Sequence, residues 1–329
     1  MHIPTLLPDE LIGGYLGRIA ILNGLDGAPA ALKALLQVRG RPRGRTACPT
    51  PFEVVSATAQ VSKPLLIGGH SLLPLRRLVS PGRVPIAHGA AQNRAIERRA
   101  LAELLMPGAR RCSECIREDI QFWGFAYDRR SAQLSGVDWC TKHGIRLEPS
   151  RGMAAAAGHA IPAQVTPAEQ RYADIFDALL ELPHSVPLSQ ACIRLRQRSQ
   201  HQGLRWRSNA NGPTMTDLAQ AIMPTRWLHQ NQPHVLGRSL NQINTVAVVP
   251  FAAHLYVLAL AVLYDSAADA LAEFLRPLTP SELEHGRQLA QRRAGRRPEI
   301  LFSNGHADHR LEDCIGASRR NRSNLVGTN

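Results

Sequence analysis

The sequence predicts a mostly α-helical protein, with a helical amino-terminal part, a small loop-rich module and a helical carboxyl-terminal domain. Apolar residues recur at three- and four-residue steps over several segments, as on the buried face of an amphipathic helix. Gly, Pro and Asn punctuate these segments. The 329 residues suffice for about two domains. The sequence contains neither a Walker lysine loop nor a dinucleotide-binding glycine fingerprint.

We expect five parts along the chain. An amino-terminal helical region (1–107) precedes the loop-rich module (108–149), and a linker rich in Ala, Gly and His follows (150–166). A carboxyl-terminal helical domain (167–278) leads into a polar helix and a basic tail (279–329).

The amino-terminal region is predicted to begin with two helices. The first starts at Pro8 or Asp9 and ends at Asn23-Gly24, where a glycine can cap the last turn. The second follows Pro29 and ends at Gly40. The pair is either a helix-turn-helix or a helical hairpin in a domain core, and spacing alone does not separate the two.

Further along this region, a basic loop is followed by more helices. Four arginines at alternate positions in 39–45 could lie along a phosphate backbone, or the segment is a solvated connector. We predict a helix over 51–60, a turn at Lys63-Pro64, a small satellite core over 72–78 and a helix over 90–106.

Two pairs of metal-competent residues define the central module. Cys112 and Cys115 are separated by two residues, as are Cys140 and His143, and 24 residues lie between the pairs. This pattern is typical of tetrahedral zinc, although unconnected buried thiols are the alternative. Four protein ligands leave no open coordination position, so we predict a structural zinc in a zinc-ribbon-like module. The spacer exceeds the usual about 15–20 residues and must carry structure of its own.

The aromatic and the acidic side chains of the module have expected roles near the metal site. Aromatic residues concentrate here, and we expect them mainly to cover the metal site, with base stacking as the alternative; they are Trp123, Phe125, Tyr127 and Trp139. Glu118 and Asp119 are adjacent, so on a helix they point apart and do not form a catalytic pair. A helix cap or a salt bridge to Arg129 or Arg130 is the expected role.

The module also resembles a known family. After the first cysteine pair come Glu-Asp, then Phe-Trp-Gly-Phe, Arg-Arg, Gln-Leu-Ser-Gly and finally Cys-Thr-Lys-His-Gly. This order over 110–148 resembles the TniQ family of transposition target-selection proteins, which includes the TnsD-like proteins. Weaker similarity extends to 8–20 and 188–264. Ser131 and Thr141 depart from the family pattern, but neither is a predicted ligand.

The resemblance implies a non-catalytic target-site selection factor of a Tn7-like or Tn5053-like transposon. Such a protein would engage an attachment sequence in DNA, or a CRISPR guide-RNA complex already bound to DNA. It would recruit an ATP-using regulator and the transposase, which breaks and joins the strands. Self-association is compatible with this role, and no catalytic residue is assigned.

The charge of the chain agrees with a nucleic-acid partner. Lys and Arg number 39 against 26 Asp and Glu, which gives a formal charge of +13 and a pI near 10.3. Such an excess concentrates polyanions at the surface, although a merely arginine-rich protein would show it too. The residues assigned to nucleic-acid or partner contact are Arg129, Arg130, Lys142, Arg205, Arg207 and Arg226.

The carboxyl-terminal domain is predicted to be helical over 167–182, 188–201, 215–222 and 225–231. The helix over 188–201 is expected to expose Arg194, Arg196 and Arg198. The last two helices flank a proline-containing turn. They form a candidate helix-turn-helix that would offer Arg226, His229 and Gln230 to a groove, or they are small helices of a bundle.

The apolar run 246–264 approaches the length of a membrane span but is interrupted by Pro250 and His254. We therefore predict a buried helix and no membrane contact. No secretory signal is visible at the start of the chain. Together with the cysteine usage, this predicts a bacterial cytoplasmic, nucleoid-associated protein. A capping box over 279–282 opens the final polar helix.

Two rival functions remain open. A metal-dependent nuclease or recombinase would need an acidic cluster that holds magnesium, and the scattered Asp and Glu residues do not establish one. A protein-only adaptor would bind its partners without contacting DNA. Direct DNA binding weakens steeply as salt rises, so salt dependence separates an adaptor from a DNA-binding protein.

Overall fold

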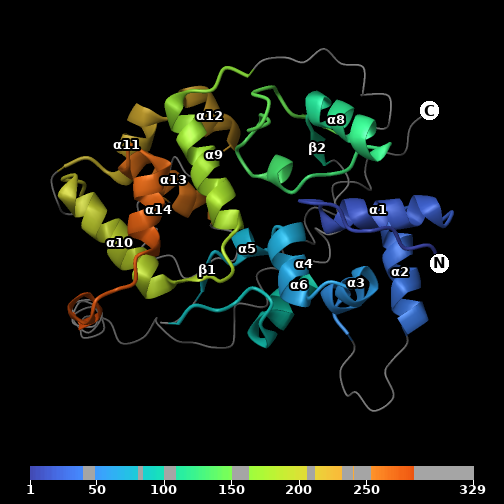
Figure 1. Ribbon diagram of the computed structural model, residues 1–329. Coiled ribbons are helices and arrows are strands. Elements are labelled where there is room, and N and C mark those ends of the chain that lie inside the picture. The colour runs from blue at the N-terminus through green and yellow to red at the C-terminus, as the bar shows by residue number, and fades with distance from the viewer. Residues whose placement is uncertain are drawn as a thin grey trace, which may run out of the picture. The chain divides into compact units, whose positions relative to one another are not determined.

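The computed structural model describes residues 1–39, 49–80, 84–99, 109–149, 163–205, 212–231, 240 and 253–284. The chain divides into two compact units, Met1–Pro277 and Leu278–Asn329. The described residues are mostly helical, with a few two-residue strands, which confirms the predicted fold class (Figure 1). The finer division into five parts stays a prediction. The basic loop beyond residue 39 and most of the linker and of the tail lie outside the described residues.

The amino-terminal helices are α1 (Ile12–Leu22), α2 (Gly27–Arg39), α3 (Pro51–Ala59), α4 (Lys63–His70) and α5 (Leu73–Arg76). Helix α1 packs against α2, and α3 packs against both α2 and α4. The helices predicted before Asn23, around Pro29 and over 51–60 are therefore present, although α2 begins two residues before Pro29 instead of after it. Their apolar faces form one buried cluster, to which α1 contributes Ile12, Tyr15, Leu16, Ile19 and Ala20.

Helix α1 begins at Ile12, three or four residues later than predicted. Asp9 has a φ of 54° and lies outside the helix. Glu10 is fully buried, where its carboxylate accepts the Leu7 backbone N–H at 3.0 Å and the Arg18 Nε–H at 2.7 Å. These bonds hold the Pro8-Asp9-Glu10 segment in a turn.

The turn predicted at Lys63-Pro64 is instead the start of α4. The Ser62 hydroxyl accepts the Leu65 N–H at 3.4 Å, which caps the helix. Pro64 lies in the first turn, where the missing N–H costs no helical hydrogen bond. The proline that was expected to break the chain here begins a helix.

A short segment joins the amino-terminal helices to the carboxyl-terminal ones. Strand β1 (Val79–Ser80) pairs in parallel with β4 (Val186–Pro187). The His88 N–H donates to the Pro183 carbonyl at 3.2 Å. The predicted helix over 90–106 is a 3₁₀ turn, η1 (Ala91–Asn93), followed by α6 (Arg94–Arg99), and its remainder lies outside the described residues.

The central module (residues 109–149) is built around one helix. It contains β2 (Arg110–Arg111), α8 (Ser113–Trp123), the 3₁₀ turn η2 (Ser131–Gln133) and β3 (Glu148–Pro149). Strands β2 and β3 pair antiparallel and bring the two ends of the module together. The long spacer between the ligand pairs thus carries structure, as predicted.

The carboxyl-terminal helices are α9 (Pro167–Leu180), α10 (Leu188–His201), α11 (Met215–Ile222), α12 (Thr225–Asn231), α13 (Ala253–Leu263) and α14 (Ala267–Leu275). Figure 1 shows α9 beside α13 and α14, and both pairs are in contact. Helix α9 buries its predicted face, which consists of Tyr172, Ile175, Phe176, Leu179 and Leu180. Every described residue from Leu255 to Leu263 is buried, as expected for the apolar run.

No single helix among the described residues has the length and apolar character needed to cross a bilayer. Two sharply bent pairs, α1 with α2 and α13 with α14, reach that length together.

Arg194 is buried, which corrects the expectation that α10 exposes its arginines. Only 1% of the side chain is exposed, and its guanidinium donates to the Pro277 carbonyl at 2.8 Å and to Gln197 Oε1 at 3.1 Å. Arg196 and Arg198 are half-buried, and Arg198 lies 4.5 Å from the Tyr264 ring. The cause is α14, an element that the sequence analysis did not predict, which packs against α10.

Helices α11 and α12 flank a turn that contains Pro224. Trp227 and Leu228 are buried in the core, whereas Arg226, His229 and Gln230 are exposed. The structure thus confirms the elements and their exposed face. Their use as a nucleic-acid-binding helix-turn-helix stays a prediction.

Candidate metal centre

The first ligand pair lies at the amino-terminal end of α8. Cys112 is the N-cap residue, and its sulfur accepts the Cys115 N–H at 3.4 Å. Three residues later on the same helix, Cys115 points to the same side. The helix ends at Gly124, whose φ of 81° suits glycine. Both thiols are buried.

The second pair lies on a tight turn. The Gly144 N–H donates to the Cys140 carbonyl at 2.8 Å, and the Cys140 N–H donates to the Ile145 carbonyl at 2.8 Å. Gly144 has a φ of 64°, which closes the turn. A bridge between Trp139 and Arg146 continues the pairing beyond it. This turn directs Cys140 and His143 toward α8.

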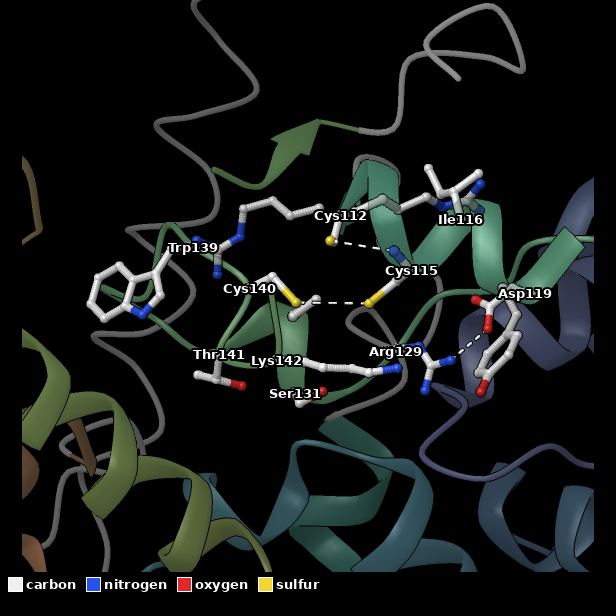
Figure 2. Close-up of a pocket in the computed structure, with 14 residues that line it drawn as sticks. Cys112, Cys115, Ile116, Asp119, Arg129, Ser131, Trp139, Cys140, Thr141 and Lys142 are labelled. Atoms are coloured by element: carbon white, nitrogen blue, oxygen red, sulfur yellow. Dashed lines mark hydrogen bonds and ion pairs between the residues drawn. The ribbon is translucent and has the colours of Figure 1, made fainter. Parts of the chain in front are cut away.

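The four side chains converge on one point. Figure 2 shows the sulfurs of Cys112, Cys115 and Cys140 in one pocket, and the ligand atoms of all four residues lie within 4.8 Å of one another. Nδ1 of His143 is 3.3, 3.4 and 3.6 Å from the sulfurs of Cys112, Cys115 and Cys140, and the last two sulfurs are 3.7 Å apart.

These separations fit a tetrahedral metal. With Zn–S near 2.3 Å and Zn–N near 2.05 Å, tetrahedral angles give about 3.8 Å between two sulfurs and about 3.6 Å between sulfur and nitrogen. The four separations given above differ from these values by a few tenths of an ångström. The cluster could therefore bind a metal ion, as predicted for these four residues.

The three thiols also influence one another's ionisation. The hydrogen bond between the Cys115 and Cys140 sulfurs lowers the pKa of Cys140 to about 5. The same bond, together with burial, raises the pKa of Cys115. Burial also raises the pKa of Cys112. Three thiolates this close repel one another, and a bound cation would offset that repulsion.

Residues 2–147 match the model of the TniQ family. The chain carries a TniQ domain. The match includes all four candidate ligands and ends at Leu147, beside the second pair. A search of curated proteins gives no match. The TniQ domain indicates a transposition-associated role, and domains of this family are generally non-catalytic accessories.

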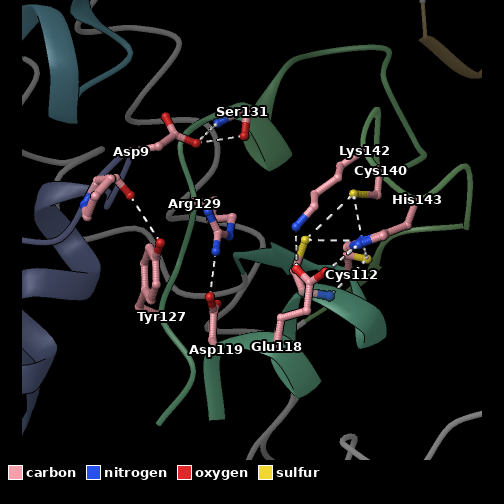
Figure 3. Close-up of polar contacts among 12 residues, drawn as sticks. Asp9, Cys112, Glu118, Asp119, Tyr127, Arg129, Ser131, Cys140, Lys142 and His143 are labelled. Atoms are coloured by element: carbon pink, nitrogen blue, oxygen red, sulfur yellow. Dashed lines mark hydrogen bonds and ion pairs between the residues drawn. The ribbon is translucent and has the colours of Figure 1, made fainter. Parts of the chain in front are cut away.

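Two adjacent carboxylates of the TniQ domain have separate partners, as predicted (Figure 3). Glu118 Oε1 is 3.1 Å from His143 Nε2, and its Oε2 is 2.5 Å from Lys142 Nζ. These hydrogen bonds, chiefly the one from Lys142, lower the pKa of Glu118. Asp119 instead pairs with Arg129 at 2.5 Å. The sequence analysis predicts the ion pair between Asp119 and Arg129 as one alternative. It does not predict the contact between Glu118 and the candidate ligand His143.

The aromatic residues of the domain divide into two groups. Tyr127 and Trp139 are each 5% exposed and line a cavity of about 140 Å³ beside the cysteines. Trp123 and Phe125 are 40% and 37% exposed, so the expectation that they cover the metal site is wrong for these two. Trp123 is exposed because it ends α8, a helix that buries little beyond Cys115 and Asp119. Phe125 lies beyond the helix, and its ring is 5.0 Å from the Arg18 guanidinium.

The predicted contact residues occupy different environments. Lys142, Arg205 and Arg226 are exposed, and Arg207 lies outside the described residues. Arg129 is half-buried and lies 4.6 Å from the Tyr127 ring. These residues come from separate elements, and the structure gathers only Arg129, Arg130 and Lys142 within the module. Their role in nucleic-acid or partner contact stays a prediction.

Arg130 faces inward and forms a buried junction that the sequence analysis missed. It is 3% exposed, pairs with Asp9 at 3.1 Å and also contacts Glu181 and the Gly68 carbonyl. Asp9 Oδ2 in turn accepts the Ser131 hydroxyl at 2.7 Å (Figure 3). Asp9, three residues before the first helix, was the available signal, but it lies more than 100 residues from Arg130 in the sequence.

Gly136 provides a second contact between the module and the carboxyl-terminal helices. Its carbonyl accepts the Trp227 indole N–H at 2.8 Å. A Cβ at this position would lie 2.9 Å from the Trp227 ring, and the φ is 79°. Tyr172 Oη also donates to the neighbouring Ser135 carbonyl at 2.9 Å. Glycine is therefore required both by conformation and by space.

Proposed function

We propose that this protein is a target-site selection factor of a Tn7-like or Tn5053-like transposon, with a structural zinc at its centre. The observation that carries the proposal is the Cys₃His cluster within the matched TniQ domain. Cys112, Cys115, Cys140 and His143 would hold the ion. When bound, zinc supplies a cross-link between α8 and the turn over 140–143, and it leaves no open position for a substrate.

The protein is proposed to act by binding. It would engage DNA, or a guide-RNA complex already on DNA, and recruit the regulatory ATPase and the transposase. The exposed cations Lys142, Arg205 and Arg226 are the proposed contacts among the described residues, with Arg207 as a further candidate from the sequence. Arginine suits this role because its planar guanidinium binds phosphate and guanine edges.

DNA binding is tested by its salt dependence. Binding of the full chain to duplex DNA should weaken linearly in log K against log salt, because phosphate contacts release counterions. Arg226→Gln should reduce the slope by about 1 for one lost phosphate contact. Arg117→Gln on α8 is a matched control, since Arg117 is exposed and pairs locally with Glu114. A flat salt response would instead establish a protein-only adaptor.

A nuclease or recombinase activity is tested by strand cleavage with magnesium. Among the described residues, the group suited to a metal consists of three cysteines and a histidine rather than of carboxylates. We expect no cleavage. Turnover that depends on magnesium and disappears on substitution of one carboxylate would overturn the proposal of a non-catalytic factor.

A further inference from the structure

We propose that Glu118 is a positioning residue of the metal centre, which orients His143 so that Nδ1 faces the three cysteines. This inference rests on the proposed zinc site and deepens it. It assigns to an exposed carboxylate a role beyond a surface ion pair.

Glu118 belongs to the same helix face as the first ligand pair. Cys112, Cys115 and Glu118 follow one another at three-residue steps along α8, so they project from neighbouring turns of one side. The Glu118 carboxylate reaches across to the second ligand turn, where it contacts both His143 and Lys142 (Figure 3). One helix therefore supplies two thiols and the group that holds the histidine.

The contact determines which imidazole nitrogen is free. An ionised carboxylate only accepts hydrogen bonds, so at the 3.1 Å contact Nε2 of His143 must be the donor. In the neutral ring, Nδ1 then keeps its lone pair. That atom is the one that lies 3.3 to 3.6 Å from the three sulfurs. A carboxylate that accepts the second N–H of a metal-bound histidine fixes its orientation and increases its basicity.

Lys142 offsets the negative charge of Glu118 beside the metal centre. A divalent ion with three thiolates and a neutral imidazole carries one excess negative charge. A lone carboxylate beside it would be repelled. Lys142 Nζ is 2.5 Å from Glu118 Oε2, so its charge offsets that of Glu118 while Oε1 remains with the histidine.

The alternative is that Glu118 only forms a surface ion pair with Lys142. The two side chains are 44% and 61% exposed, and such pairs contribute little to stability. The two interpretations differ in what happens to the metal when Glu118 is removed. A surface pair predicts unchanged zinc affinity, whereas a positioning residue predicts a loss.

The test measures zinc affinity of the full chain by competition with a chromophoric chelator. Glu118→Ala should weaken zinc binding by about 10- to 100-fold, as for other groups that support a metal-bound histidine. Glu118→Gln should recover part of the loss, because its amide oxygen still accepts the Nε2–H. Glu114→Gln, one turn earlier on α8 and paired with Arg117, should leave the affinity unchanged.

A spectroscopic measurement complements the affinity. Cobalt(II) bound to the unmodified protein should show the visible bands of a tetrahedral thiolate site. Weaker or shifted bands are expected for Glu118→Ala, and a spectrum close to that of the unmodified protein for Glu118→Gln. Lys142→Met should have a smaller effect on zinc affinity than Glu118→Ala, since Lys142 acts through the carboxylate.

Failure of the inference and failure of the proposed zinc site are distinguishable. If the unmodified protein binds stoichiometric zinc and Glu118→Ala binds it equally tightly, the positioning role is wrong and the zinc site stands. If the unmodified protein binds no zinc, both are wrong. Should Glu118→Ala not fold, Glu118→Leu, whose side chain cannot accept the Nε2–H, is compared with Glu114→Gln, and equal zinc affinities would overturn the role.

Discussion

The metal module and the carboxyl-terminal helices are stabilised in different ways. The buried apolar cluster around the candidate ligands is small and consists of Cys112, Cys115, Ile145 and Leu147, whereas Leu134, Val137 and Trp139 of the module belong to the core of the carboxyl-terminal helices. By contrast, α9 and α13 belong to a large continuous core, in which Tyr172, Ile175 and Leu179 are fully buried. The comparison shows how one chain combines two solutions: where too few apolar side chains gather, convergent ligands and polar bonds substitute for a core.

The largest expected effect is on the module. Cys115→Ser removes one thiolate from a closed site, and binding of a structural zinc is worth on the order of 10 kcal/mol in small zinc domains. We expect loss of bound zinc and rapid amide exchange in α8 and over 140–147, with slow exchange preserved in α9 and α13. Zinc analysis and hydrogen exchange measure this. Equal exchange in both regions would show that the module does not depend on its ligands.

Phe274→Ala tests the opposite region. Phe274 is fully buried in α14, and removing a buried phenyl ring typically costs about 3–5 kcal/mol. Denaturant unfolding should show this loss, while zinc content stays as in the unmodified protein. Phe122→Ala is the matched control, because that ring is 77% exposed and should change stability little. A loss of zinc in Phe274→Ala would mean that the two regions are not independent.

Acidification should weaken the segment that joins the amino-terminal helices to the carboxyl-terminal ones. Burial, with the nearby His184 and Arg77, lowers the pKa of His88 to about 4 from a usual 6.5. The unfolded chain therefore takes up the proton first as pH falls. The free energy of unfolding is therefore not reduced by His88 above pH 6.5. It falls as the pH drops toward 4, by about 3 kcal/mol in total.

The measurement is the unfolding free energy between pH 7 and pH 4, compared between the unmodified protein and His88→Gln. The substitution should flatten the pH dependence. His229→Gln, at an exposed position of α12, should leave it unchanged. Parallel curves for the unmodified protein and His88→Gln would contradict the prediction.

A smaller effect is expected where the module meets the other helices. Arg130→Met removes charge-assisted hydrogen bonds to Asp9 and Glu181, each partly exposed, and should cost about 1.5–3 kcal/mol. Arg117→Met, at a side chain that is 67% exposed, should be nearly neutral. Denaturant unfolding compares the two variants. Equal stabilities would show that the buried junction contributes nothing.

The sequence predicts the elements whose signals are local. Periodic apolar residues located α9, the long apolar run located α13, and the paired two-residue spacers located the four candidate ligands. What it missed depends on contacts between distant segments. Arg194 reads as an exposed arginine on a polar helix until α14 covers it. Glu118 reads as a surface acid because its partners lie about 25 residues away on another turn. The sequence does not show that Arg130, assigned to nucleic-acid or partner contact, is buried and paired with Asp9 and Glu181.

Gly136, in the loop before the second ligand pair, packs directly against Trp227, which lies far from it in the sequence. Trp227 lies on α12, next to the exposed Arg226. If the ion left and the loop that carries Gly136 relaxed, the indole would lose both its acceptor and the flat surface beneath it. Removal of the ion should therefore increase amide exchange in α12, although none of the four candidate ligands lies on that helix.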